Sequence, residues 1–462
     1  MPSLRLRIEL RDVEPTIWRE VVVPADLPLT ELHSAIQAAM GWGNAHPYSF
    51  ARGEDSASGM VWASVRLDGA LPLDGARLDA LVAEVGDTAT YRYDFGDNWQ
   101  HELRVLDGAP EPAQAGSDVA LLDGAGACPP EDCGGARGYS ELLGWVADLE
   151  AGRSAPKRAL AQLNWVAGSL DARAIRRVLQ YDGAVAARRV ATASTPLPAL
   201  RSDVADLLSR APGGGSGVLR EMVVLADLAR RERLDDAECE VLTSDLRWFL
   251  DFVGPEGLPL TAAGHLKPSA VTHVAQHLDL DRERFGKMNQ EELTLPVTHL
   301  RQAAASLGLV RIVKRTLQRS GAGHALLEDP RGLVELMVDK LPVGAPGFER
   351  DGGLVLLLDL AGRDVREGDA PEASSPKERR SAVEQERRER EAMIGRIGEA
   401  MASLGWRGER GPVTGWEVRK EAAGTLAVLE RCGIVALDRR GAGWNPTPIG
   451  RAFLVWALRP GA

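Results

Sequence analysis

The chain has 462 residues, 44% of them hydrophobic and 26% charged, so it has ordinary globular usage and enough length for roughly two to four domains. Its formal net charge of −11 argues against a general nucleic-acid coat protein, although local basic patches remain compatible with that charge. No apolar run reaches the roughly 18–20 residues of a membrane span, and no secretory signal opens the sequence. Four scattered cysteines do not form a disulfide framework, so we expect a cytoplasmic protein without a membrane partner.

The first part of the chain mixes strand and helix patterns. Residues 4–10 alternate apolar and polar side chains, which is typical of a half-buried strand, and residues 17–23 are rich in β-branched side chains. Thr30 is a natural N-cap for the amphipathic helix that follows it. Two further strands are expected at 88–93 and 99–106, joined as a hairpin. This pattern predicts an α+β domain.

The later part of the chain is mainly helical. Residues 300–327 and 425–454 both follow the order helix, glycine turn, strand, loop, helix. That order is the outline of a winged-helix unit. Thr261, Ser320 and Thr447 each precede a glycine by three residues, and we expect them to be N-caps in three related copies. A mainly α region of winged-helix-like units is therefore expected.

The composition of the linkers divides the chain into five parts. Residues 377–391 mix acidic and basic side chains, which favours a solvated helix or linker over a helix that binds a partner. The parts are an α+β domain at 1–190, a linker at 191–217, a helical, winged-helix-like region at 218–362, a charged linker or helix at 363–392, and a second winged-helix-like unit at 393–462.

The loop between the two later strands is rich in polar side chains. Residues 94–98 contain two aspartates and an asparagine, and His101 follows on the next strand. Strand alternation places His101 on the same face as Trp99 and Leu103, toward apolar neighbours. In one interpretation the aspartates only cap the turn and His101 is a half-buried strand residue. In the other, these side chains contribute to a ligand or metal site.

A second irregular loop lies at residues 128–135, where two prolines and two glycines exclude a regular element. A thiol and two carboxylates on such a rigid loop are typical of functional loops. The cysteines at 128 and 133 lack the second pair that structural zinc sites use. A mixed site of Cys128 with His46 or His101 is the weaker alternative to free thiols.

Three ordered segments, Trp42–His46, Tyr93–His101 and Cys128–Tyr139, together resemble the plasmid pRiA4b ORF-3-like family, with a likeness over about residues 3–185. The resemblance implies an α+β domain of bacterial and mobile-element proteins, sometimes labelled transposon passengers or resolvase-like, without an assigned reaction. The family often has a second histidine where this chain has Tyr48, so a site that requires both imidazoles is not expected. The sequence shows no Tyr-x-Arg-x-Ser-type nucleophile strand, so we do not infer recombination.

If the two polar loops meet in space, their side chains form one pocket that could bind a divalent metal or perform acid–base chemistry. The alternative is that the carboxylates only fix two irregular loops by accepting backbone hydrogen bonds. The expected ligand-binding residues are His46, Tyr93, Asp94, Asp97, Trp99, His101, Cys128, Glu131, Asp132, Gly134 and Gly135.

The mainly helical region has one basic stretch, because residues 300–319 contain five basic side chains and no acidic one. A basic wing could contact phosphates without reading sequence. The predicted recognition helix has few side chains that read bases, so a protein-interaction scaffold is the favoured role. The candidates for nucleic-acid contact are Arg311, Lys314, Arg315, Arg439 and Arg440.

These patterns favour a binding or regulatory accessory protein, associated with mobile elements through the resemblance, that has a polar ligand pocket in its N-terminal domain. A metal-assisted hydrolase that uses the same pocket is the alternative, and a purely structural module is a third. The sequence contains no P-loop, Rossmann fingerprint or serine-hydrolase elbow. A divalent metal is the one cofactor that the residues suggest, and the partners suggested are protein or nucleic acid.

Overall fold

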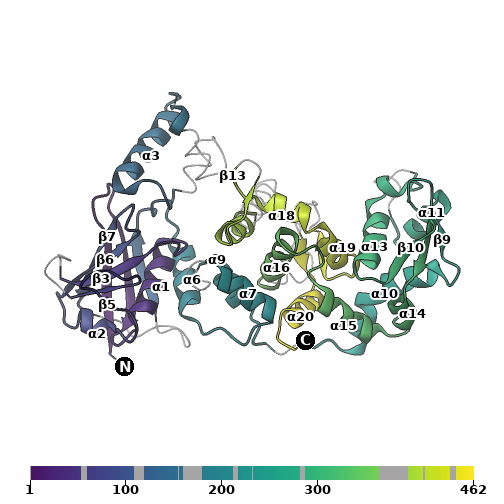
Figure 1. The fold of residues 1–462 in the computed structure, drawn as a ribbon, viewed down its shortest axis with the longest axis horizontal. Coiled ribbons are helices and arrows are strands. Elements are labelled where there is room, and N and C mark those ends of the chain that lie inside the picture. The colour runs from purple at the N-terminus through teal and green to yellow at the C-terminus, as the bar shows by residue number, and fades with distance from the viewer. Residues whose placement is uncertain are drawn as a thin grey trace, which may run out of the picture. The chain divides into compact units, whose positions relative to one another are not determined.

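The computed structural model describes residues 2–53, 60–108, 119–154, 156–159, 179–211, 217–230, 233–280, 287–363, 394–408, 411–437 and 444–461 (Figure 1). The chain forms two compact units. The first consists of Met1–Leu197, Leu208–Val224 and Ser403–Pro412, and the second of Pro198–Leu207, Leu225–Ala402 and Val413–Ala462. A large sheet fills the first unit and the second is mainly helical, which confirms the expected fold class.

The sheet of the first unit contains eight strands among the described residues, in the order β5-β4-β3-β6-β7-β1-β2-β8. Neighbouring strands are antiparallel except for the parallel pair β4 and β5. The strands are β1 (Ser3–Leu10), β2 (Ile17–Pro24), β3 (Tyr48–Arg52), β4 (Val61–Ala63), β5 (Leu71–Pro72), β6 (Thr88–Tyr93), β7 (Trp99–Leu106) and β8 (Ala120–Ala125).

The four strands expected from the sequence are confirmed as β1, β2, β6 and β7. Their alternating patterns produce one buried face. On β1, the side chains of Leu6, Ile8 and Leu10 are buried, and on β7 those of Trp99 and His101 are buried with them. His101 therefore faces apolar neighbours, as the alternation predicts.

Helix α1 (Leu29–Met40) packs against α6 (Gly183–Ser194) and places the loop that follows it beside the sheet (Figure 1). The prediction that Thr30 caps this helix is wrong. Pro28 stands at the N-cap position and no side chain caps the helix, which begins before Thr30. Gly41 ends α1 with a φ of 96°, and its N–H donates to the carbonyl of Gln37 over 2.7 Å.

The other described helices of the first 225 residues are the four-residue α2 and three helices that follow the last strand of the sheet in the sequence. These helices are α2 (Leu78–Leu81), α3 (Gly135–Glu150), α7 (Ser202–Arg210) and α9 (Val218–Leu225).

The second unit contains a three-stranded sheet in the order β10-β11-β9, with helices before and between its strands. Lys314 and Arg315 form the turn between β10 and β11, and their φ values are 48° and 59°. The elements are α10 (Asp236–Val253), β9 (Leu258–Pro259), α11 (Pro268–His277), η1 (Glu291–Leu293), α13 (Leu295–Ser306), β10 (Val310–Val313), β11 (Thr316–Arg319), α14 (Gly321–Ala325), α15 (Pro330–Lys340) and α16 (Phe348–Ala361).

The last part of the chain contains two small hairpins and the helices α18, α19 and α20. Strands β14 and β15 pair antiparallel after α19, and α19 packs against α13. The elements are β12 (Arg407–Gly408), β13 (Gly411–Pro412), α18 (Gly415–Glu421), α19 (Ala423–Arg431), β14 (Val435–Leu437), β15 (Trp444–Pro446) and α20 (Pro448–Ala457).

Two of the three expected N-caps in this region are confirmed. The hydroxyl of Ser320 accepts the N–H of Gly323 over 3.0 Å, and that of Thr447 accepts the N–H of Gly450 over 2.9 Å. Thr261 is not a helix cap, because its hydroxyl accepts the N–H of His265 in a turn.

Several expectations concern residues outside the described part of the chain. They are the charged stretch 377–391, nearly all of the charged linker or helix expected at 363–392, and Arg439 and Arg440. Over the residues that the structure describes, no helix combines the length and the hydropathy needed to cross a bilayer.

Candidate metal centre

The loop after α1 is fastened to the loop that contains Cys128. The indole N–H of Trp42 donates to the carbonyl of Pro129 over 2.8 Å, and the N–H of Gly43 donates to Oε1 of Glu131 over 3.0 Å. Trp42 is itself packed between Tyr93 and Trp99. These two hydrogen bonds, of which the one from Trp42 is buried, hold residues 42–46 against the Cys128 loop.

The hairpin loop between β6 and β7 joins the same assembly. Oδ1 of Asp94 accepts the N–H groups of Gly96 and Asp97, at 2.8 and 3.3 Å, and Asp94 has a φ of 53°. The turn-capping interpretation of Asp94 is therefore correct for this oxygen. Oδ2 of Asp97 instead accepts the N–H of Gly134 over 3.1 Å. The hairpin loop and the Cys128 loop therefore meet.

The contact between these loops requires glycine at position 135. Its φ is +69°, and a Cβ added there would lie 2.6 Å from the carbonyl oxygen of Asp97. A side chain would thus force the two loops apart. Close backbone approach therefore explains the second glycine of the Gly-Gly pair, whereas Gly134 has a φ of +90°, which itself favours glycine.

His46 lies at the centre of the assembled loops, and both of its ring nitrogens face carboxylates. Its Nδ1 is 3.7 Å from Oδ2 of Asp94. Its Nε2 is 3.4 Å from Oδ1 of Asp132 and 3.7 Å from Oε2 of Glu131. One ligand atom each from His46, Asp94 and Asp132 lie within 4.8 Å of one another. Three carboxylates and an imidazole thus converge from three separate loops.

Two atoms of this cluster are buried without a hydrogen-bond partner, namely Nε2 of His46 and Oε2 of Glu131. The other oxygen of Glu131 accepts the hydroxyl of Tyr93 and the N–H of Gly43, each over 3.0 Å. Burial raises the pKa of Glu131, and the two hydrogen bonds oppose that rise. Buried polar atoms almost always have partners, so this facing pair requires an explanation.

Tyr93 is held as a hydrogen-bond donor at this site. Burial and the neighbouring Glu131 raise the pKa of its hydroxyl, so it stays protonated and donates to Glu131. The N–H of Ala45 donates to the same hydroxyl over 3.0 Å. Tyr93 thereby links the loop that carries His46 to the loop that carries Glu131.

His101, Trp99 and Cys128 do not join the His46 cluster. Burial lowers the pKa of His101 to about 3, and its ring packs edge-on against Trp42 at 5.3 Å. Trp99 is a core residue. Burial raises the pKa of the Cys128 thiol well above its ordinary value, and among the described residues its sulfur is not part of the group of ligand atoms around His46.

A buried network around His33 positions the loop that carries His46. Nδ1 of His33 lies 2.8 Å from the hydroxyl of Tyr91, and Nε2 lies 2.5 Å from Oδ1 of Asn44. Gln37 donates its amide N–H to the Tyr91 hydroxyl and accepts the N–H of Asn44. Burial lowers the pKa of His33 to about 4, so its imidazole is neutral, with Nε2 donating to Asn44 and Nδ1 accepting the Tyr91 hydroxyl.

Sequence reasoning missed His33, Gln37 and Asn44 as supports of the site. The signal was present, because His33 and Gln37 occupy the helix face that buries Leu29, Leu32 and Ile36. A histidine and a glutamine at core positions of a helix must find buried partners. Tyr48, at the position of the second histidine in the family pattern, stacks on His33 with centroids 3.4 Å apart.

The five basic residues of 300–319 divide into two groups. Arg301 forms an ion pair with buried Glu291, and Arg319 donates to the carbonyl of Gly254 over 3.2 Å. Arg311, Lys314 and Arg315 are exposed, and no ion pair joins them to another residue of the described ranges. Three of the five cations of residues 300–319 therefore remain accessible on the hairpin.

The fold and the site together define an α+β domain whose largely antiparallel sheet supports an acidic cluster around one histidine. The model of the plasmid pRiA4b ORF-3-like family matches residues 2–176. The chain is 39% identical over 173 residues to the uncharacterized protein y4hQ of Sinorhizobium fredii, covering 36% of this chain and 81% of that protein. The chain belongs to the plasmid pRiA4b ORF-3-like family.

A solved structure is also similar to part of the chain. It is the crystal structure of MM3350, a protein of unknown function from Methanosarcina mazei Go1, which is 27% identical. The match covers 39% of this chain and 96% of that chain, with a TM-score of 0.32.

Proposed function

We propose that the N-terminal domain binds one divalent cation between His46, Glu131 and Asp132, and that the protein is a binding or regulatory accessory protein built around this site. The supporting observation is the pair of buried atoms, Nε2 of His46 and Oε2 of Glu131, that face each other at 3.7 Å without hydrogen bonds. Ligand atoms that share a cation at about 2.0–2.2 Å lie roughly 3.3–3.6 Å apart. Nε2 of His46 lies near that range from both carboxylates, at 3.4 Å from Oδ1 of Asp132 and 3.7 Å from Oε2 of Glu131.

The ligand set restricts the kind of cation. One imidazole with two carboxylates suits zinc, manganese or ferrous iron, and it does not suit a soft cation that prefers thiolates. Asp94 would contact the ring nitrogen of His46 that does not bind the cation, because its Oδ2 lies 3.7 Å from Nδ1. Such a carboxylate orients a metal-bound imidazole and raises its basicity.

A metal-assisted hydrolase is a second candidate, favoured by one observation. The side chain of Asp132 is 68% exposed, so the cluster is open to solvent on that side. Catalytic metal sites keep such an open position for water or substrate, whereas structural sites are closed. Cation-dependent hydrolysis of a phosphate or carboxylate ester that disappears in His46→Ala would favour this candidate over simple binding.

Titration of the metal-free full chain with zinc and manganese tests the proposal. We expect one cation per chain by elemental analysis after gel filtration. We also expect stabilisation of about 2.7 kcal/mol at a free-ion concentration 100-fold above the dissociation constant. A chain that retains no stoichiometric cation and shows no stabilisation with any first-row divalent ion contradicts the proposal.

For the second unit, we infer winged-helix architecture with a scaffold role. The element order α10-β9-α11-α13-β10-β11 and the strand order β10-β11-β9 support this inference, with β10 and β11 as the wing. In such units the helix before the wing enters DNA. Here that helix, α13, packs against α19, and Nδ1 of His299 lies 3.2 Å from Oε2 of Glu430. Because α13 already packs against another helix of the same unit, a scaffold role is favoured over DNA binding.

The scaffold role predicts that the full chain does not shift a duplex of about 30 base pairs at roughly 50 mM salt, where phosphate contacts are strongest. It also predicts that Arg311→Ala/Lys314→Ala/Arg315→Ala behaves as the unsubstituted chain, because these cations then have no phosphate to contact. Salt-sensitive binding that the triple variant loses would instead assign the wing to nucleic acid.

A further inference from the structure

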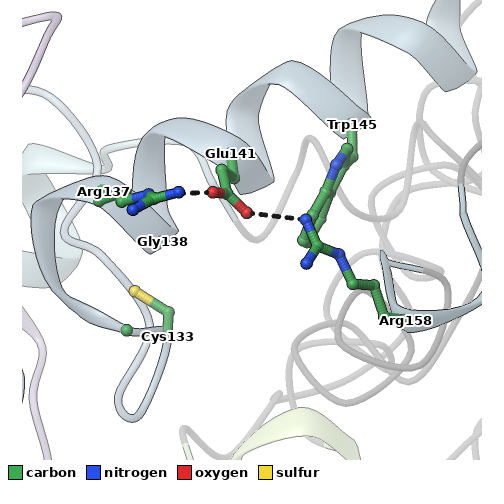
Figure 2. Close-up of a pocket in the computed structure, with 7 residues that line it drawn as sticks. Cys133, Arg137, Gly138, Glu141, Trp145 and Arg158 are labelled. Carbon is green, nitrogen blue, oxygen red and sulfur yellow. Dashed lines mark hydrogen bonds and ion pairs between the residues drawn. The ribbon is translucent and has the colours of Figure 1, made fainter.

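A pocket of about 310 Å³ lies along one face of α3, outside the His46 cluster (Figure 2). Arg137, Glu141 and Trp145 follow one another at helical spacing on this face, and Arg158 approaches from the segment beyond the helix. Cys133 lies at the end nearest the start of α3. At this volume the pocket matches the lower end of small-molecule sites.

Two guanidinium groups in the pocket share a single carboxylate. Nε of Arg137 is 3.3 Å from one oxygen of Glu141, and a terminal nitrogen of Arg158 is 3.3 Å from the other (Figure 2). The charged groups that line the pocket therefore sum to one net positive charge. No acidic residue lies in the first turn of α3, so the helix dipole adds to the positive potential at that end.

The pocket also has an aromatic wall. The guanidinium carbon of Arg158 lies 5.6 Å from the centroid of the Trp145 ring (Figure 2). The indole packs on the hydrophobic core with one side and is half-buried. A planar ligand ring would take the place of the Arg158 guanidinium over this indole, while its anionic group meets the guanidinium groups of Arg137 and Arg158.

Stability does not explain this arrangement. The side chains of Arg137 and Arg158 are 90% and 75% exposed, and exposed ion pairs contribute roughly 0–1 kcal/mol. Two arginines that share one exposed carboxylate leave donor capacity unused, since each guanidinium has five N–H groups. The spare donors and the aromatic wall together are what a phosphate with a planar ring requires.

We propose that this pocket binds a mononucleotide, with the phosphate held by Arg137 and Arg158 and the base beside Trp145. The site is independent of the cation proposed for His46. Glu141 orients both guanidinium groups but also competes with the phosphate for them. Its removal should therefore strengthen binding, a change of sign that a purely structural role does not predict.

Calorimetric titration of the full chain with AMP in EDTA tests the proposal, because EDTA separates it from cation binding. We expect one site per chain, with adenosine and inorganic phosphate each binding at least about tenfold more weakly than AMP. Arg137→Ala/Arg158→Ala should lose about tenfold or more in affinity, and Glu141→Gln should gain about threefold or more.

Arg153→Ala is the matched control, because Arg153 is also exposed and pairs with Asp148 outside the pocket. We expect its AMP affinity to equal that of the unsubstituted chain. The absence of binding heat up to about 5 mM AMP overturns the proposal, as does equal affinity in the double variant and the unsubstituted chain.

Discussion

Acidification from pH 7 to pH 4 should lower the free energy of unfolding of the first unit by several kcal/mol, because two of its buried histidines are held neutral. Burial lowers the pKa of His33 to about 4 and that of His101 to about 3, against about 6.5 for an exposed histidine. Between pH 6.5 and the folded-state values, the unfolded chain binds protons that the folded chain does not. Stability is therefore complete above pH 6.5 and is lost as the pH falls, by up to about 1.4 kcal/mol per pH unit for each histidine.

Urea unfolding of the full chain at pH 7, 6 and 5 measures this slope. His101→Phe removes one titrating group, so its unfolding free energy should depend less on pH, by up to about 1.4 kcal/mol per unit. Leu103→Ala is the matched control, because Leu103 is buried on the same face of β7. It should cost about 2–5 kcal/mol at every pH without changing the slope. Identical slopes in His101→Phe and the unsubstituted chain would contradict the neutral, buried state of His101.

Replacement of His46 should produce the largest loss of cation affinity. His46→Ala removes the imidazole that faces Glu131 and Asp132, and we expect the dissociation constant to rise at least about 100-fold. Asp94→Asn keeps an oxygen that accepts the N–H of Gly96, but it removes the negative charge that faces Nδ1 of His46. We expect it to cost about 10–100-fold.

His265→Ala in the second unit is the matched control for His46→Ala. Its Nδ1 also lies near two carboxylates, at 3.8 Å from both Glu291 and Glu292. Oε2 of Glu291, however, already accepts the N–H of Leu266. The Glu291 oxygen that faces His265 is therefore already hydrogen-bonded, unlike Oε2 of Glu131 beside His46. We expect the control to bind the cation as the unsubstituted chain does. A loss of affinity in His265→Ala equal to that in His46→Ala would indicate adventitious binding by surface histidines.

The strands and the general position of the site follow from local sequence patterns. Alternation of side chains is a property of consecutive residues, so β1 and β7 could be predicted, as could the inward direction of His101. The two irregular loops could be identified from their prolines, glycines and carboxylates. Ser320 and Thr447 were predictable as caps because capping depends on a residue and the three that follow it.

The pairing of groups within the site depends on contacts that no local pattern contains. The hydrogen bonds that the N–H groups of Gly134 and Gly43 donate to Asp97 and Glu131 join residues far apart in the chain. They determine that His46, and not His101, faces the carboxylates. Thr30 fails as a cap for a different, local reason, because the helix already begins at Leu29 with Pro28 at its N-cap position.

Diffraction from crystals soaked in manganese or zinc, recorded near the absorption edge of the metal, locates the ion itself. The account predicts one anomalous peak per chain at about 2.0–2.2 Å from Nε2 of His46, with oxygens of Glu131 and Asp132 in contact with it. A soaked crystal with no peak there, or with a direct Glu131–His46 hydrogen bond in its place, would show that the polar loops merely hold one another.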